Sequence, residues 1–89
     1  MKIIEGFKLR EVAGQSVVAG EGLQQIDFNR LIALNTTAAY LWKQVEEKEF
    51  TTGTLASLLA ARYEVDDETA LKDATETAEE WLKAGLITE

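Results

Sequence analysis

The hydrophobic pattern changes period once, near Asn35, and this change constrains the fold more than any other feature of the sequence. Before it, Phe7–Val12 opens with alternating apolar and polar residues, and Ser16–Ala19 follows a short Gly-containing turn. Such patterns predict two β-strands, and strands joined this tightly predict an antiparallel hairpin. Ile26–Leu34 predicts a third extended segment, whose end, Leu31–Leu34, is apolar on both faces.

Apolar residues after Asn35 recur at steps of three and four, which is typical of helices that bury one face. Asn35 is a good N-cap, because its side-chain oxygen can accept hydrogen bonds from free backbone amides. This first helix is predicted to run to Val45. A second helix is predicted from Thr51 to near Tyr63, since Thr51 as its N-cap places two large apolar residues at the positions of a hydrophobic staple, Phe50 and Leu55.

A third helix is predicted to begin at the acidic segment Val65–Glu68 and to end near Lys83. Acidic residues in its first turn suit the helix dipole. Gly85 is a natural residue to follow its end, and Leu86 can then contact Trp81 to complete a Schellman stop. The apolar residues 86–87 should dock on the core. The buried stripe of this helix is narrow and has small residues in its middle: Leu71, Ala74, Ala78, Trp81 and Leu82.

Three strands followed by three helices predict an α+β fold, because the two kinds of element are segregated along the chain. The expected architecture is a three-stranded antiparallel sheet followed by three helices, similar to a winged helix-turn-helix. Eighty-nine residues predict a single domain spanning residues 1–89. We see neither a secretory signal pattern nor a membrane span, and the lack of Cys fits a reducing cytoplasm, where we expect the protein to reside.

The composition excludes most catalytic chemistry, because the chain contains no His and no Cys. Ser-His-Asp triads, imidazole or thiolate metal sites and Cys nucleophiles are therefore absent. The spacing Gly20-x-Gly22 lacks the rest of a dinucleotide fingerprint and opens no predicted helix. A catalytic carboxylate would need a buried cleft that so short a chain seldom builds. We predict no enzymatic activity, no catalytic residue, no metal and no cofactor.

Charge is distributed unequally along the chain, whose net charge is −7. Residues 1–45 hold five basic and four acidic side chains, whereas residues 46–89 hold four basic and twelve acidic ones. In a DNA-binding winged helix the third helix would enter the major groove, and the acidic side chains here would oppose the phosphates. We therefore expect no binding to nucleic acid or to anionic membranes, although the winged-helix geometry itself can stand.

Several segments together resemble the PqqD family, the pyrroloquinoline quinone biosynthesis protein D group, which is the stand-alone form of the recognition element for ribosomally made, modified peptides. The resemblance covers essentially the whole chain. It rests on these segments in this order: Phe7–Arg10, Leu34–Asn35 followed by Thr36–Ala38 and Leu41–Trp42, Phe50–Thr52, Leu55 with Leu58–Leu59, Tyr63–Asp66, and Leu82–Ile87. The block from Leu34 to Trp42, combined with the Tyr63–Asp66 turn, is its most specific part.

The resemblance implies a non-catalytic module that binds the leader of a precursor peptide and presents it to a modifying enzyme, such as a radical SAM protein, or to a leader protease. In this family the leader adds as a strand to the free edge of the third strand, and its apolar side chains enter between that strand and the third helix. Residues 30–34 contain no Pro, and their only charged residue is Arg30, so this strand edge suits such β-augmentation. The predicted peptide-binding residues are Arg30, Leu31, Ile32, Ala33, Leu34, Leu71, Lys72, Thr75, Ala78, Glu79 and Leu82.

Two other functions remain open at this point: a winged-helix regulator that binds DNA, and a subunit that scaffolds an enzyme without contacting a peptide. We expect a monomer, or a weak dimer if the open edge pairs with itself. The small residues Ala74 and Ala78 also have two interpretations, since they could leave room for a groove or pack closely against the sheet.

Overall fold

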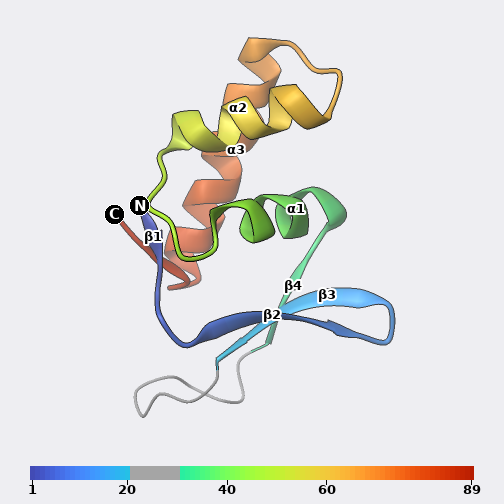
Figure 1. The fold of residues 1–89 in the computed structure, drawn as a ribbon, viewed down its shortest axis with the longest axis vertical. Helices are drawn as coiled ribbons and strands as arrows, with labels where there is room; N and C mark the ends of the chain where they lie inside the picture. Colours follow the sequence, from blue (N-terminus) through green and yellow to red (C-terminus); the bar gives the residue numbers. More distant parts are fainter. Residues whose placement is uncertain (21–30) are drawn as a thin grey trace.

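The structure, a computed structural model of the chain, describes residues 1–20 and 31–89, in which strands precede helices (Figure 1). The α+β prediction of a three-stranded antiparallel sheet followed by three helices is confirmed. The part of the predicted third strand from residue 26 to 30 lies outside the described residues. The elements in chain order are β1 (Lys2–Ile3), β2 (Phe7–Val12), β3 (Gln15–Gly20), β4 (Leu31–Leu34), α1 (Thr36–Val45), α2 (Thr52–Arg62), α3 (Asp67–Lys83) and β5 (Ile87–Thr88).

The main sheet has the strand order β2-β3-β4, with antiparallel pairing throughout. Val12 pairs with Gln15, so the β2–β3 hairpin has a two-residue loop, Ala13 and Gly14. Both loop residues have positive φ, 53° and 80° respectively, which is the backbone conformation of a type I′ turn. The turn matches the right-handed twist of the strands it joins, and the predicted hairpin is confirmed.

All three helices begin with side-chain caps. Asn35 Oδ1 accepts from the amide of Ala38 at 2.8 Å, which confirms the predicted N-cap of α1. Thr51 caps α2 in a reciprocal capping box, in which Thr54 takes the place that Glu or Gln usually occupies. Asp66 Oδ1 accepts from the amide of Thr69 at 2.7 Å at the start of α3. These caps fix where each helix begins relative to the segment before it.

The end of α3 is the predicted Schellman stop. The amide of Leu86 donates to the carbonyl of Trp81 at 2.9 Å, and the amide of Gly85 donates to that of Leu82 at 3.1 Å. Gly85 has φ 76°, a left-handed conformation in which a Cβ would be strained. The stop turns the chain back onto the helices, and Leu86 and Ile87 are buried in the core, as expected.

The two ends of the described chain pair with each other, which the sequence did not predict. β1 and β5 form a separate two-stranded antiparallel sheet, and the N and C ends lie near one another in Figure 1. The amide of Ile4 extends this pairing by donating to the carbonyl of Leu86 at 2.9 Å. The Met1 amino group donates to the carbonyl of Phe50, and the Phe50 amide donates to that of Met1. Together these bonds join the first residues to the last helix and to the start of α2.

Two tryptophans anchor the core. Trp42 of α1 and Trp81 of α3 are both buried and meet edge to face, with their ring centroids 5.3 Å apart. Phe50 packs against Trp81 in the same manner at 6.4 Å. The indole N–H of Trp42 is buried and has no hydrogen-bond acceptor among residues 1–20 and 31–89. The core therefore lies among the three helices and the side of the sheet that faces them, and it leaves the outer edge of β4 outside.

Candidate functional site

The first candidate site is the edge of the main sheet formed by β4. Within residues 1–20 and 31–89, β4 pairs with β3 only, in a register that sets Ile32 opposite Val18 and Leu34 opposite Ser16. Its other edge therefore has no strand beside it in the described part of the chain. The four residues carry no charged side chain. An edge of this kind can accept a further strand.

Side chains of β4 alternate between the two faces of the sheet. Leu34 is buried and Ile32 is half-buried, and both belong to the side that packs on the core. Leu31 and Ala33 are exposed on the other face. This alternation follows from the period of two in a β-strand, which places successive side chains on opposite faces. The strand is thus held to the protein by one face and presents apolar groups on the other.

The chain after β4 fixes the strand in place. Leu34 is 8% exposed, and the next residue, Asn35, caps α1 through the amide of Ala38. The buried face of α1, which includes Leu41 and Trp42, then continues directly into the core. Because the strand ends at a capped helix with one buried face, the edge is positioned by the packed core.

The predicted peptide-binding residues of α3 differ in how exposed they are. Leu71 is 51% exposed, whereas Leu82 is half-buried. Thr75 is also half-buried and donates its hydroxyl to the carbonyl of Leu71 at 2.7 Å, so this donor is already used. Two other predicted residues, Lys72 and Glu79, are exposed.

Two small residues of α3, Ala74 and Ala78, are buried in the core at 0% and 2% exposure, so close packing describes both of them in this structure. Arg30 lies outside the described residues. The structure thus gathers Leu31–Leu34 on one strand and the remaining predicted residues on α3, but the α3 set includes one buried alanine. Leu71 lines a shallow surface hollow with α2 residues such as Ala56 and Ala60, so the start of the predicted stripe faces α2.

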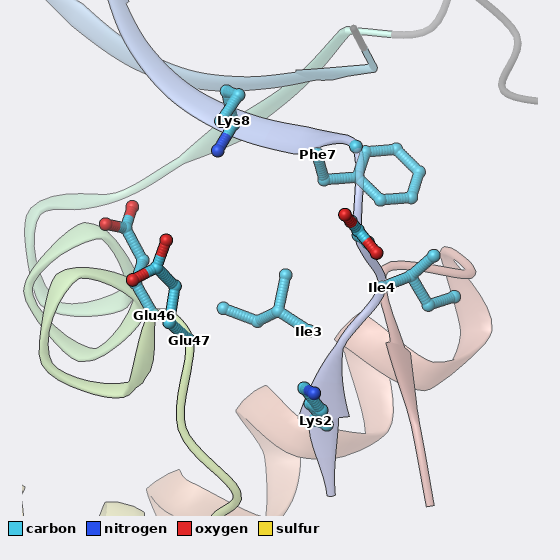
Figure 2. Close-up of a pocket in the computed structure, with 9 residues that line it drawn as sticks. Lys2, Ile3, Ile4, Phe7, Lys8, Glu46 and Glu47 are labelled. Atoms are coloured by element: carbon cyan, nitrogen blue, oxygen red, sulfur yellow. The ribbon is translucent and has the colours of Figure 1, made fainter. Parts of the chain in front are cut away.

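A second candidate site, which the sequence did not indicate, is an open hollow of about 350 Å³ at the other side of the sheet. Figure 2 shows Glu46 and Glu47 from the end of α1 facing Lys8 of β2 across it, with Ile3 between them. Its lining comes from residues 2–8 and 46–47 and includes no residue of β4. Because these two segments are distant in sequence, no local motif could have revealed it.

The chemistry of this hollow is that of a solvated surface. It is lined by two lysines, three glutamates and the apolar side chains of Ile3, Ile4 and Phe7. Among the described residues, no group of three or more potential ligands is arranged to hold a metal ion. Nothing in this lining is a nucleophile paired with a base, which acyl or phosphoryl transfer would require. We therefore take the β4 edge as the functional candidate.

The electrostatics of the helical half are acidic. The acidic residues of α3 are exposed, and the only basic residues of this helix are Lys72 and Lys83. The amide of Thr69, which donates to the Asp66 carboxylate at the start of α3, lowers the pKa of that group, with the Thr69 side chain contributing further. This carboxylate therefore remains charged as a cap. None of the helices in the described residues is long and apolar enough to cross a membrane.

Comparison with known proteins places this geometry in a family. A family model described as "Coenzyme PQQ synthesis protein D (PqqD)" matches residues 16–87. The chain belongs to the PqqD family. The predicted resemblance is thereby confirmed, over a stretch that includes β4 and all three helices. No match was found among curated proteins.

The fold of this PqqD-family chain is also seen in a solved structure, TbiB1 in complex with the TbiA(beta) leader peptide. The two chains are 20% identical and superpose with a TM-score of 0.74, covering 97% of this chain and 93% of that one. At this identity the likeness concerns the fold. Nearly the whole chain takes part in this shared fold.

Proposed function

We propose that this protein is a non-catalytic module that binds the leader segment of a ribosomally made precursor peptide by adding it as a strand to β4. One observation carries the proposal: β4 is an uncharged strand whose outer edge is unpaired within the described residues. Membership in the PqqD family supports it, and so does the fold shared with TbiB1, whose solved structure contains a leader peptide. Proteins usually protect such an edge, so an open one favours use in binding.

The affinity would come from the backbone and from apolar contacts. In an antiparallel strand the N–H and C=O groups of successive residues point alternately to the two sides, so two of the four β4 residues direct theirs away from β3. A bound strand can therefore form up to four backbone hydrogen bonds, each worth about 1 kcal/mol net. Burial of apolar leader side chains beside Ile32 and Leu34 would supply the remainder.

The chemical step would belong to a partner. The sequence contains no His and no Cys, so it lacks the usual nucleophile and base pairs. We propose that the bound leader holds the rest of the precursor near a modifying enzyme, of the radical SAM type, or near a leader protease. The function of the module is then to raise the local concentration of the precursor at that enzyme.

DNA binding is the weaker alternative. The side chains that a winged helix would turn toward the phosphates are those of α3, and its acidic residues are exposed. Contact with the duplex would gain little from counterion release and would bring like charges together. A fluorescence anisotropy titration with genomic fragments at low salt should show no tight, salt-sensitive binding.

An NMR titration tests the leader proposal. Isotope-labelled protein is titrated with peptides that cover the first halves of short open reading frames encoded near its gene. We expect one of them to shift the amide signals of Leu31–Leu34 and of α3 residues between Leu71 and Leu82. A folded protein that shows no shifts with any candidate would contradict leader binding.

A second experiment separates leader binding from simple scaffolding. The neighbouring modifying enzyme is co-purified with this protein in the presence and absence of the precursor. The proposal predicts that the precursor enters the complex through β4. The proline substitution that removes an outward N–H of β4, at Ile32 or Ala33, should therefore exclude the precursor from the complex. Unchanged precursor capture by that variant would favour a scaffold that does not contact the leader.

A further inference from the structure

The outer face of β4 carries the most exposed large apolar side chain in the described residues. Leu31 is 63% exposed, and Ala33 on the same face is exposed as well. Their neighbours across the ladder are Ala19 and Val17 of β3, which are also apolar. Val17 is buried and Ala19 is half-buried, so the exposed apolar surface of these paired positions lies at the open edge, on Leu31 and Ala33.

Polarity changes across this outer face from one edge strand to the other. On β2 the residues opposite Ala19 and Val17 are the basic residues Lys8 and Arg10, and Lys8 also lines the hollow beside the end of α1. On β4 the residues at the same levels are Leu31 and Ala33, so the face is apolar there. A strand added to β4 would place alternate side chains directly beside these two, at the spacing at which cross-strand pairs interact.

Single exposed leucines are common on protein surfaces and need no explanation by themselves. Leu31 differs in its position, because it stands on a strand whose edge is unpaired in the described chain and which carries no charge. Ala33, the next residue of β4 on the same face, is small and does not cover the side chain of Leu31. A polar or charged side chain placed beside Leu31 would gain no apolar contact and would lose hydration.

From this arrangement we infer that β4 recognises its peptide on both faces, with Leu31 and Ala33 selecting apolar side chains on the outer one. This inference rests on the proposed function and specifies its substrate class. The preferred segment has consecutive apolar residues, as β4 itself has, in place of the alternating apolar and polar pattern that a one-faced groove would accept. Leu31 is thus a specificity-determining residue that contributes little to the fold.

Two short synthetic peptides test the inference. Both carry flanking lysines for solubility; one has Val-Val-Val-Val at its centre and the other has Val-Thr-Val-Thr. Val and Thr have nearly the same shape and both favour strands, so the pair differs mainly in the polarity of one face. By NMR titration we expect the all-valine peptide to bind β4 about fivefold more tightly, the upper range of a cross-strand contact.

Matched protein variants assign the preference to its residue. Leu31→Thr should abolish the difference between the two peptides, whereas Val12→Thr should leave it unchanged. Val12 is the suitable control, because it is 54% exposed on β2, the strand at the opposite edge. Equal binding of the two peptides by the native protein, or a preference that survives Leu31→Thr, would overturn the inference.

The leader titration distinguishes the two levels of the proposal. If a natural leader shifts the signals of β4 but the synthetic pair binds equally, the outer-face inference fails and leader binding stands. If neither a leader nor a synthetic peptide shifts β4, both fail together. Both are supported if Leu31→Thr loses the preference between the synthetic peptides and still binds the leader at β4, but more weakly than the native protein does.

Discussion

The main sheet ends in two outer strands that differ in their protection against pairing. β2 carries three charged residues among its six, Lys8, Arg10 and Glu11, whereas the four residues of β4 carry none. Charged side chains discourage another strand from docking at an edge, because docking would strip their water. We infer from this difference that exposed backbone groups are not sufficient for a binding edge. The side chains beside those groups must also permit pairing.

The largest effect that we predict separates the two ends of β4. Leu34→Ala should lower the free energy of unfolding by about 2–4 kcal/mol, because Leu34 is buried in the core. Leu31→Ala should change it by less than about 0.5 kcal/mol, since Leu31 is exposed. Urea unfolding followed by circular dichroism measures both. Similar losses for the two variants would mean that the whole strand is structural and would weaken the assignment of Leu31 to binding.

Proline distinguishes the hydrogen bonds that β4 makes to β3 from those it offers outward. Ile32→Pro and Ala33→Pro form a pair in which one substitution removes an outward N–H and the other removes a ladder donor, because the two alternate. The outward variant should remain folded and bind the leader at least about tenfold more weakly, through one lost bond and a blocked approach. Circular dichroism and the NMR titration report the two effects separately. A folded proline variant at each position with native affinity would exclude strand addition.

A lysine can make β4 resemble β2. Ala33→Lys should weaken leader binding about fivefold, because an exposed charge at this edge would have to be desolvated on pairing. Val12→Lys adds the same charge on β2 and should leave the affinity unchanged. Since both variants alter net charge equally, isothermal titration calorimetry compares them without a long-range electrostatic difference. Equal weakening by both would show that bulk charge, and not the edge, controls binding.

The smallest predicted effect is a pH dependence that belongs to the fold and not to the edge. The pKa of Asp66 is lowered from 3.8 by the amide of Thr69, so its stabilising contribution is present above that value and is lost as pH falls through the lower one. Asp66→Ala should therefore lower the melting temperature slightly at pH 7 and have less effect in strong acid. Thermal melts at both pH values measure this. β4 has no ionisable side chain, and no matching acid-dependent change in its backbone pairing is expected.

Much of the fold could be predicted because its signals are local. The caps at Asn35 and Thr51 and the stop at Gly85 each depend on a few neighbouring residues, and the structure confirms them. The β1–β5 sheet could not be predicted in this way. Its strands have two residues each and join residue 2 to residue 88, so neither shows a period and only the assembled core brings them together.

The candidate site likewise has a part with a local sequence signal and a part that depends on packing. The edge at Leu31–Leu34 could be anticipated because a run that is apolar on both faces, without charge, is visible in the sequence. The α3 residues of the candidate site were harder to predict, since packing sets which side of a helix faces a neighbour. Ala78 illustrates this, because the stripe that suggested a groove places it in the core. Leu71 illustrates it again by lining a hollow with α2.

The pairing of β1 with β5 also has a consequence for how this domain can be fused to other proteins. The two chain ends lie near each other, and in Figure 1 both stand well away from β4. A fused domain attached at either end would therefore leave the outer edge of β4 clear, and the amide that replaces the Met1 amino group could still donate to the Phe50 carbonyl. Covalent tethering to an enzyme would turn a weak encounter into an intramolecular one. The same architecture can thus serve as a freestanding adaptor or as a built-in domain.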